Sequence, residues 1–448
     1  MPREDTYNHY FSGVDEDAGT KGRAAKNFKR GKSNKIGLHI RGLAQSRKCV
    51  ITANMNQPPT VLIVGAGAVG LSVARAIQRS ISLSSSNILL LDKSSTIATQ
   101  TSGRNSSVIH AGIYYPQSSL KATLCVKGRS LLLDYCDSHD IRVLRSGKMI
   151  VGSNPNPADL QRLLKLAAAN DVPNLRLLAG SELNLMEPNI HAPHGGIHSP
   201  GTSVFDSADF LWKLFGEIST NGCIDTIFNH TVTSVKPSPS TGTGAGVVVT
   251  MMDSANQISS ELEVDFVVNA AGIGMNSIEI VDEKQQHITF FAKGNYFKLK
   301  SGIPPPFRSL VYPMPDPNGG LGVHSTLDVT SPNTTRFGPD VQWIPRGEQF
   351  NYGEDGGQVR RETFYKEIKK YYRGLEREDD LEFEFSGVRP KLYHPDAGQG
   401  DSKTMDFVIE GRKQHGMRNV VNLYGIESPG LTSCLAIGEY VVNECLDI

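Results

Sequence analysis

The chain has 448 residues, of which 39% are hydrophobic, and 46 lysines and arginines balance 46 aspartates and glutamates. This composition is typical of a folded globular protein and excludes a disordered or fibrous one. The balanced charge gives no overall attraction to nucleic acid or to an anionic membrane, so we expect a small-molecule partner. The six cysteines form no CxxC pair and no metal-ligand spacing, which predicts reduced thiols and no metal site.

The first 58 residues predict an extension that stays outside the fold. No Asp or Glu occurs between Asp17 and Asp92, and ten basic residues lie between Lys21 and Lys48. A basic, acid-free segment is typical of an organelle transit segment, which predicts a mitochondrial location. Acidic residues before Asp17 argue against targeting, and a solvated basic tail on a cytoplasmic protein is the alternative.

A βαβ unit is predicted from Thr60 onward. The apolar run TVLIV predicts a strand buried on both faces, residues 70–80 have helical apolar spacing, and NILLLD from Asn87 predicts a second parallel strand. Amphipathic helices are expected over 120–139 and 158–170. No uninterrupted apolar run is long enough to cross a bilayer, because three glycines break the stretch VLIVGAGAVGL, so we predict no transmembrane segment.

Later segments divide into two kinds. VDFVVNAAG from Val264 and NVVNLYG from Asn419 predict further buried strands, and a helical pattern follows the second. Segments 140–200 and 285–385 instead contain short alternating runs and frequent prolines, which predict an inserted antiparallel sheet. Residues 238–246 are expected to form a hairpin tip or a surface loop.

These two kinds of segment interleave, so the sequence predicts an α/β fold with discontinuous domains. A Rossmann-like, nucleotide-binding domain with a parallel sheet is expected to combine with a mostly antiparallel α+β substrate domain. The predicted nucleotide-binding domain comprises residues 59–140, 196–285 and 386–448, and the predicted substrate domain comprises 141–195 and 286–385. The polar stretch 346–361 is expected to be exposed.

A G-x-G-x-x-G fingerprint joins the first strand to the first helix. Gly65 permits the tight turn, Gly67 lets the backbone approach a pyrophosphate, and Gly70 lets helix and strand pack closely. Asp92 ends the next strand, where it would accept hydrogen bonds from a ribose diol. This context favours dinucleotide binding over a glycine turn that serves packing alone.

The loop after Asp92 favours FAD over NAD. The sequence TSGRNSSVIHAGIYY, residues 101–115, is rich in Gly, Ser and Asn, which offers small donors and close backbone approach to a flavin and its diphosphate.

At this point the sequence resembles a known family. SGRNSSVIHAGIYY, SLKATLCVKG, SGKMIV, FVVNAAG, KGNYFKL, LVYPMPDP, LGVHSTLD, FGPDVQWI, SGVRPKL, DFVI and GIESPGLTSCLAIGEYV, in this order, resemble the L-2-hydroxyglutarate dehydrogenases. These belong to the D-amino-acid-oxidase-like flavoproteins. The resemblance implies a two-domain FAD enzyme that oxidises L-2-hydroxyglutarate, a 2-hydroxy dicarboxylic acid, to 2-oxoglutarate. It further implies an electron acceptor other than NAD, and a quinone-linked acceptor is one possibility.

The resemblance also implies which residues bind the cofactor. The first glycine turn and its acid would bind the ADP half of FAD, the loop after Thr101 would lie along the pyrophosphate and flavin, and two later turns would complete the site. The implied cofactor residues are Gly65, Gly67, Gly70, Asp92, Ser102, Arg104, Asn105, Ser106, Ala271, Gly272, Gly425, Ser428, Gly430, Leu431 and Thr432.

Oxidising a 2-hydroxy acid needs a base for the hydroxyl proton and a cation for the carboxylate. Histidine is the natural base, and its placement on a strand of the inserted sheet favours His324 over His110, which we keep as a flavin-positioning residue or an alternative base. Arg389 resembles the superfamily arginine that binds the substrate carboxylate, although a surface ion pair is the alternative. Tyr296 and Tyr312 are candidate donors to substrate oxygens, and Lys293 is a weaker candidate for the distal carboxylate.

Three other functions remain open on the residues alone. An amino-acid or amine oxidase of the same superfamily would use the same flavin, arginine and hydride transfer. A protein that binds a dinucleotide without turnover, or an NAD-linked dehydrogenase, would share the glycine fingerprint.

Overall fold

The computed structural model describes residues 58–446 except 81, 153–156, 221–223, 240–245, 282–286, 316–321, 346, 354–355, 397–405 and 418. The predicted basic extension therefore lies outside the described residues. All described residues belong to one compact unit, residues 50–448. In the part of the chain that is described, no helix is both long and apolar enough to cross a membrane.

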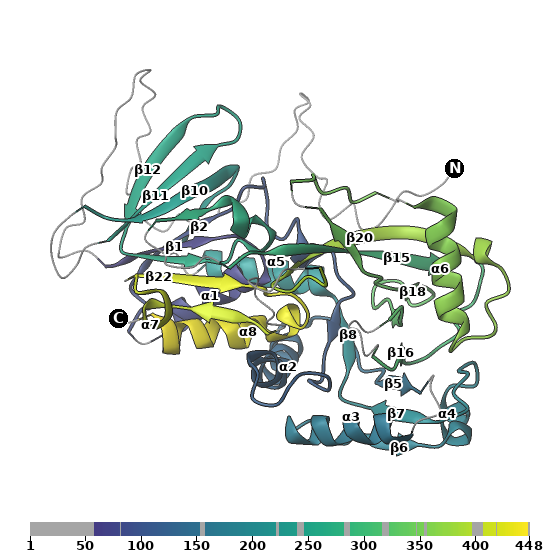
Figure 1. The fold of residues 1–448 in the computed structure, drawn as a ribbon. Helices are drawn as coiled ribbons and strands as arrows, with labels where there is room; N and C mark the ends of the chain where they lie inside the picture. Colours follow the sequence, from purple (N-terminus) through teal and green to yellow (C-terminus); the bar gives the residue numbers. More distant parts are fainter. Residues whose placement is uncertain are drawn as a thin grey trace, which may run out of the picture. The chain divides into compact units, whose positions relative to one another are not determined.

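A six-stranded sheet forms the first layer (Figure 1). Its order is β21 (Val408–Glu410), β22 (Val420–Tyr424), β13 (Phe266–Asn269), β1 (Thr60–Val64), β2 (Asn87–Leu91) and β9 (Ile224–Ile227). Every neighbouring pair is parallel except β21 with β22. The predicted parallel sheet and its four predicted strands are confirmed.

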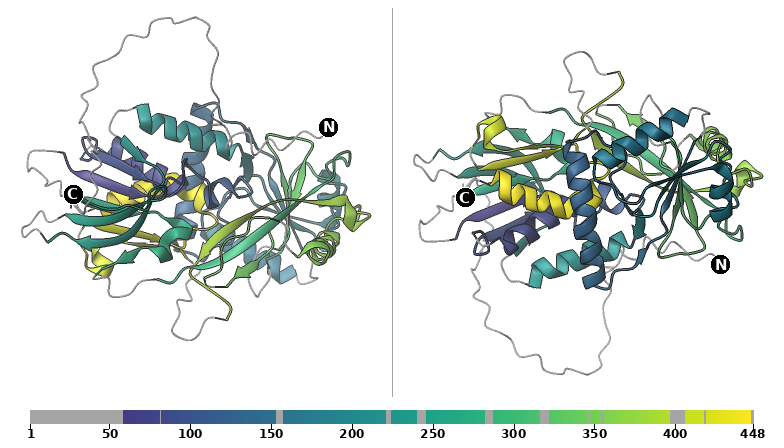
Figure 2. Two further views of the ribbon diagram at one scale, coloured as in Figure 1. Left: turned by 90° about the horizontal axis from the view of Figure 1, so that it is seen from above. Right: turned by 90° about the horizontal axis from the view of Figure 1, so that it is seen from below.

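Four helices cover one face of this sheet. They are α1 (Ala68–Arg79), α2 (Leu120–Ser138), α5 (Ser207–Thr220) and α8 (Gly430–Tyr440), which continues as a π-helical turn over Val441–Cys445. Helix α8 packs against both α1 and α2 (Figure 2). A Cβ at Gly128 would lie 2.5 Å from the Thr432 carbonyl oxygen, so glycine allows α2 to approach the start of α8.

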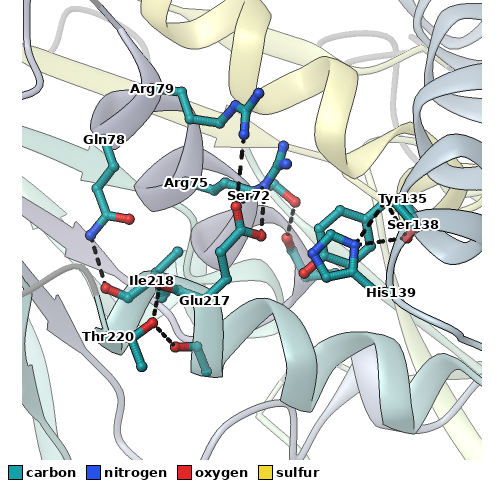
Figure 3. Close-up of polar contacts among 12 residues, drawn as sticks. Ser72, Arg75, Gln78, Arg79, Tyr135, Ser138, His139, Glu217, Ile218 and Thr220 are labelled. Carbon is teal, nitrogen blue, oxygen red and sulfur yellow. Dashed lines mark hydrogen bonds and ion pairs between the residues drawn. The ribbon is translucent and has the colours of Figure 1, made fainter.

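Polar contacts join α1, α2 and α5 (Figure 3). Glu217 on α5 pairs with Arg75 at 2.9 Å and lies 3.9 Å from Arg79, both on α1. The Tyr135 and His139 rings stack with centroids 3.9 Å apart at the end of α2. The ion pairs join α5 to α1, and Arg75 also lies 5.0 Å from the centroid of the Tyr135 ring of α2, so the three helices are held to one another.

A four-stranded sheet covers the opposite face. Its order is β12 (Ser259–Val264), β11 (Val247–Asp253), β10 (His230–Pro237) and β14 (Glu279–Ile280). Strand β1 is buried between two layers because Val61 and Ile63 face the helices while Leu62 and Val64 face this sheet. Strands β10 and β11 pair antiparallel on either side of residues 238–246, which were expected to form a hairpin tip or a surface loop. Most of these residues, 240–245, lie outside the described part of the chain.

The inserted sheet has nine strands. Its order is β19 (Gln342–Ile344), β15 (Phe290–Leu299), β18 (Thr335–Phe337), β17 (Ser325–Leu327), β16 (Leu310–Pro313), β5 (Lys148–Val151), β7 (Gly196–Ser199) and β6 (Arg176–Leu178), and β20 (Leu381–Lys391) also pairs with β15. Among the described residues, all strand pairs of this sheet are antiparallel except β5 with β16, so the predicted mostly antiparallel sheet is confirmed. Strand β7 lies wholly beyond the predicted boundary at 195, and β20 crosses the predicted boundary at 385, although both belong to the inserted sheet. The division into domains stays a prediction.

The two faces of the inserted sheet differ in chemistry. Met149, Val311 and Phe297 lie on an apolar face, where they pack with Phe364 of α6 (Gly357–Lys369). Successive strand residues point to opposite faces, so Lys148, Tyr312 and Tyr296 lie on the other face. We call this second face the polar face.

Smaller elements connect the two main sheets. A three-stranded sheet orders β3 (Val108–Ile109), β8 (Ser203–Phe205) and β4 (Val143–Leu144). Val108 and Val204 pack on Leu310 and Tyr312, so β3 lies against the polar face. The remaining short helices are α3 (Pro157–Ala169), α4 (Gly180–Met186), α7 (Arg412–His415) and the 3-10 turns η1 (Thr101–Gly103), η2 (Gly272–Ser277) and η3 (Glu378–Asp380).

The stretch 346–361 was expected to be exposed, and most of its described residues are exposed. Phe350 and Tyr352 within it are half-buried. The guanidinium carbon of Arg104 lies 4.4 Å from the centroid of the Tyr352 ring, and the Tyr352 hydroxyl donates to the Gln100 side chain. Aromatic residues in a polar stretch were the signal for this packing.

Candidate active site

The first glycine turn has the geometry that the fingerprint predicts. Gly65 has φ +104°, and a Cβ there would lie 2.5 Å from the Ala270 carbonyl oxygen at the end of β13. A Cβ at Gly70 would lie 1.9 Å from the Gly65 carbonyl oxygen. Only glycine allows α1 to begin this close to both strand ends.

Backbone donors collect where this turn enters α1. The N–H of Ala68 donates to Ser102 Oγ at 3.0 Å. Within the described part of the chain, the N–H groups of Gly67, Val69 and Gly70 have no acceptor, and the first turn of α1 has no acidic side chain. Free donors at the positive end of a helix suit a diphosphate, so these residues fit a dinucleotide.

Asp92 has a second role that the sequence did not predict. Its carboxylate accepts the N–H of Ala66 at 2.8 Å and the N–H of Ser94 at 2.8 Å, so it fixes both turns. Each carboxylate oxygen keeps a further lone pair, so the predicted ribose contact stays compatible with the structure.

The loop after Thr101 is fixed by its own side chains. Asn105 Nδ2 donates to the carbonyl oxygens of Thr101 and Ser102, and its Oδ1 accepts the N–H of Ser107. Arg104 Nη1 donates to the Ser386 carbonyl oxygen at 3.4 Å. Arg104 and Asn105 therefore shape the loop, and their direct contact with flavin stays a prediction, as does that of the half-buried Ser106.

The two later turns predicted to complete the cofactor site approach from β13 and β22. Ala271 and Gly272, which has φ +55°, follow β13 beside Gly65. Gly425, with φ +64°, follows β22 and opens the loop to α8.

The start of α8 is tied to β3 through His110. Thr432 Oγ1 accepts the N–H of His110 at 3.0 Å and donates to the Val108 carbonyl oxygen at 3.2 Å. Ser428 Oγ lies 3.3 Å from His110 Nε2. Gly430 and Leu431 begin the helix, so all these predicted residues lie around one helix N-terminus.

We expect Gly70→Ala to abolish FAD retention, because the added methyl group would meet backbone that cannot move away. The flavin content of the purified variant, measured by visible absorbance, checks this. Gly216→Ala is the matched control: Gly216 lies in α5 with nothing within 4 Å of its Cβ, and the change should add up to about 1 kcal/mol of stability. Full flavin content in Gly70→Ala would contradict the assignment.

A buried ion-pair network that the sequence reasoning missed supports the loop before α8. Glu427 pairs with Lys121 of α2 at 2.9 Å and with Lys391 of β20 at 2.7 Å. Burial opposes ionisation of this carboxyl, but the two ammonium groups outweigh it and lower the pKa of Glu427 to about 2. The motif GIESPG contained the acid, but its partners lie 306 and 36 residues away.

We expect Glu427→Gln to lower the free energy of unfolding by about 3 kcal/mol, because it leaves two buried ammonium groups without their counter-charge. Denaturant unfolding of the holoenzyme measures this. The folded pKa lies below the ordinary value of 4.5, so the stabilisation is present above pH 4.5 and is lost only as the pH falls toward 2. Asp137→Asn, in an exposed pair with Arg145, should cost less than about 1 kcal/mol. Equal losses in both variants would refute the role.

His324 lies on the polar face immediately before β17, one residue short of the strand on which it was expected. It is 4% exposed, and its ring stacks on Tyr312 with centroids 3.8 Å apart. Its Nδ1 lies 3.0 Å from the Gly322 carbonyl oxygen, which can only accept, so Nδ1 carries the proton and Nε2 keeps its lone pair. Burial, together with the charges of Lys148 and Arg389, lowers the pKa of His324 to about 3, although the hydrogen bond with Gly322 raises it.

His110 lies close to His324. Burial, then the charges of Lys148 and His324, lower the pKa of His110 to about 3. The two predicted histidines thus come together from positions just after β3 and just before β17, although 214 residues separate them in the sequence. Both rings are neutral at physiological pH, as a base must be before it accepts a proton.

Arg389 lies on β20 opposite Ala292 of β15. Its Nη2 donates to the Asp340 carbonyl oxygen at 2.6 Å, and its charge reaches His324. Tyr296, on the neighbouring strand, acts electrostatically on Tyr312, whose hydroxyl is buried. Four of the five predicted catalytic residues therefore share the polar face, and His110 faces them from β3.

Lys148 is the other residue that the sequence reasoning missed. Its side chain is 1% exposed, and its ammonium lies 4.6 Å from the centroids of both the Tyr114 and Tyr312 rings. Lys293, which was considered for the distal carboxylate, instead donates to the Gly353 carbonyl oxygen at 2.9 Å. Strand alternation places Lys293 on the side of β15 away from Arg389, because Arg389 pairs with Ala292.

A family model described as FAD dependent oxidoreductase matches residues 60–444. The chain belongs to this family. FAD is therefore its cofactor, which confirms the prediction of FAD over NAD, and the glycine turn with its free donors fits the FAD diphosphate.

The family's curated relatives agree with the resemblance inferred from the motifs. The chain is 37% identical, over 91% of its length and 86% of the relative's, to "L-2-hydroxyglutarate dehydrogenase, mitochondrial" of Arabidopsis thaliana. It is 27% identical over 86% of its length to "L-2-hydroxyglutarate dehydrogenase" of Salmonella houtenae, covering 92% of that protein. The predicted membership in this group is confirmed.

Solved structures share the fold. The FAD-bound L-alpha-glycerophosphate oxidase of Mycoplasma pneumoniae aligns with TM-score 0.70 at 22% identity, covering 86% of this chain and 94% of its own. Glycine oxidase of Geobacillus kaustophilus aligns with TM-score 0.64 at 16% identity, covering 86% and 94%. The predicted combination of a parallel and a mostly antiparallel sheet is confirmed as the fold of these flavoproteins.

Proposed function

We propose that the protein oxidises L-2-hydroxyglutarate to 2-oxoglutarate and passes the electrons to an acceptor other than NAD. The identity of 37% over 91% of the chain with the Arabidopsis dehydrogenase carries this proposal. Neutral histidines and buried cations on the polar face give it a chemical basis.

The proposed base is His324. The reaction removes a proton from the hydroxyl oxygen and a hydride from the α-carbon, and bound FAD supplies the hydride acceptor. His324 Nε2 is suited to accept the proton because its ring is fixed by Gly322 and by stacking on Tyr312. The imidazolium that results is disfavoured by nearby cations, and the negative charge of the bound substrate offsets them.

The proposed carboxylate ligand is Arg389. Its planar guanidinium can form two parallel hydrogen bonds with the α-carboxylate, and its contact with the Asp340 carbonyl oxygen fixes its direction. Burial raises the pKa of Tyr312 above its usual range, so its hydroxyl stays protonated and can donate to a substrate oxygen. Tyr296 is proposed as a second donor.

We also propose that the protein acts in mitochondria. The relative from Arabidopsis carries that location in its name, and the basic segment between Lys21 and Lys48 is typical of a transit segment. The electron acceptor is proposed to be quinone-linked, which is one of the acceptors other than NAD that the resemblance leaves open.

Anaerobic titration tests the reaction. The purified protein should be yellow, and L-2-hydroxyglutarate should bleach the flavin absorbance while the D-enantiomer leaves it unchanged. Reduction by glycine, sarcosine or a D-amino acid, with L-2-hydroxyglutarate inert, would instead assign the chain to the amine-oxidising relatives.

A further inference from the structure

Lys148 is buried without a counter-charge. Lys148 is 1% exposed, and no hydrogen bond or ion pair joins its ammonium to any residue that the structure describes. The other buried lysine of the same sheet, Lys293, donates to a carbonyl oxygen. Burying an ammonium group without a partner is costly, so the position of Lys148 favours an anionic ligand.

The two aromatic rings beside Lys148 give its ammonium a defined direction. The Tyr114 and Tyr312 rings both lie 4.6 Å from Nζ, which stabilises the cation while leaving its hydrogen-bond donors unused. Strand pairing places Ile150 opposite Tyr312, so Lys148 lies on the adjacent strand, two residues away along β5. The amine is thereby presented on the polar face.

The positive charges of Lys148 and Arg389 both act on His324. The Tyr312 ring stacks on His324 and also contacts the Lys148 ammonium, so this ring links the two groups. The charge of Arg389, on β20, also reaches His324. A 2-hydroxy dicarboxylic acid has the matching pattern, because its hydroxyl lies beside one carboxylate and a second carboxylate follows along the chain.

We propose that the Lys148 ammonium binds the distal carboxylate of the substrate and sets the preference for 2-hydroxy dicarboxylic over 2-hydroxy monocarboxylic acids. This inference rests on the proposed function. Arg389 binds the carboxylate next to the hydroxyl, and Lys148 binds the far one.

The surroundings of Lys148 give the proposal a pH signature. The titratable groups around its ammonium are His110, Tyr114, Cys125, Tyr312 and His324. Burial lowers the pKa of Lys148 to about 7, whereas the two histidines have pKa values of about 3, the thiol about 12, and both phenols lie above 10. Only the protonated amine binds a carboxylate, so kcat/KM for the dicarboxylic acid falls about tenfold per pH unit above pH 7.

The test compares two substrates on the FAD-loaded enzyme. L-2-Hydroxypentanoate has the same carbon chain as L-2-hydroxyglutarate but a methyl group in place of the distal carboxylate. Lys148→Met should lower kcat/KM for L-2-hydroxyglutarate by about 100-fold, because a buried charged contact is lost. The same variant should leave kcat/KM for L-2-hydroxypentanoate within about threefold of wild type and should remove the fall above pH 7.

Lys293→Met is the matched control, because it removes a buried lysine from the same sheet. It should leave the ratio of kcat/KM for L-2-hydroxyglutarate to kcat/KM for L-2-hydroxypentanoate unchanged, whatever it does to stability. Lys148→Met should retain FAD and a thermal midpoint at or above that of wild type, since removing an unpaired buried amine relieves its desolvation. If Lys148→Met does not fold, Lys148→Gln serves with the same expected ratio.

Two results for Lys148→Met would overturn the proposal. Equal losses of kcat/KM on both substrates would give Lys148 a part in the chemical step. Full activity with an unchanged ratio of the two kcat/KM values would show that Lys148 does not contact the distal carboxylate. Failure of wild type to be reduced by either hydroxy acid would instead reject the proposed function.

Discussion

His324→Asn should lower the rate of flavin reduction by L-2-hydroxyglutarate about 1,000-fold, while FAD stays bound. Asparagine preserves a donor for the Gly322 carbonyl oxygen, which His324 Nδ1 satisfies at 3.0 Å, but it has no basic nitrogen in place of Nε2. The variant therefore removes the proposed base without leaving a buried carbonyl oxygen unpaired. Anaerobic stopped-flow absorbance measures the rate of reduction directly.

Two further histidine variants test whether His324, rather than another histidine of the site, is the base. His110→Asn should slow reduction by about tenfold or less, because His110 contacts Ser428 at the start of α8 and positions the flavin loop. His198→Asn is the control. His198 lies on β7 and pairs with Met149, so its side chain lies on the face of the sheet opposite His324. The rate of flavin reduction in this variant should stay within about twofold of wild type. A larger loss in His110→Asn than in His324→Asn would exchange their roles.

Arg389→Met should lower kcat/KM for L-2-hydroxyglutarate by about 100- to 1,000-fold, mainly through a higher KM. The guanidinium is proposed to bind the α-carboxylate, and methionine removes both its charge and its donors. Arg389→Lys keeps the charge but not the planar fork, so it should recover only part of this loss. Steady-state kinetics with an artificial electron acceptor separates KM from kcat.

Arg176→Met provides the comparison for this arginine. Arg176 is exposed on β6 of the same nine-stranded sheet, so its replacement should change kcat/KM by less than about twofold. Wild-type KM in Arg389→Met would show that Arg389 serves the structure alone, through its bond to the Asp340 carbonyl oxygen.

Local pattern was sufficient to predict the cofactor-binding layer. The strand β1, the glycine turn and the helix α1 follow one another within 60–79, so the sequence shows their order and spacing directly. The clash of a Cβ at Gly70 with the Gly65 carbonyl oxygen is the physical reason for the fingerprint. Conversely, the bonds of Asp92 to the N–H groups of Ala66 and Ser94 depend on side-chain direction, which the motif does not specify.

The polar face was harder to predict, because it is assembled from distant strands. Lys148 in KMIV looks like an ordinary polar residue at the start of a strand, and lysine is seldom buried. Its burial follows from the parallel pairing of β5 with β16, 162 residues apart at Lys148 and Leu310. The apolar neighbours Met149, Ile150 and Val151 were the available signal that this strand lies inside.

The ion pairs of Glu427 were hard to predict for the same reason, because their partners are distant in the sequence. Its motif indicated a flavin loop, but the lysines that lower its pKa come from α2 and β20. Long-range pairing of charges leaves no periodic pattern in one sequence, whereas glycine turns and apolar strands do.

A crystal structure of the dithionite-reduced enzyme with L-2-hydroxyglutarate would show how the substrate binds, since the reduced flavin cannot turn it over. We expect the C2 hydroxyl within about 2.6–3.2 Å of His324 Nε2 and the adjacent carboxylate on the Arg389 guanidinium. A substrate bound away from the polar face, with its hydroxyl directed to neither His324 nor His110, would contradict this expectation.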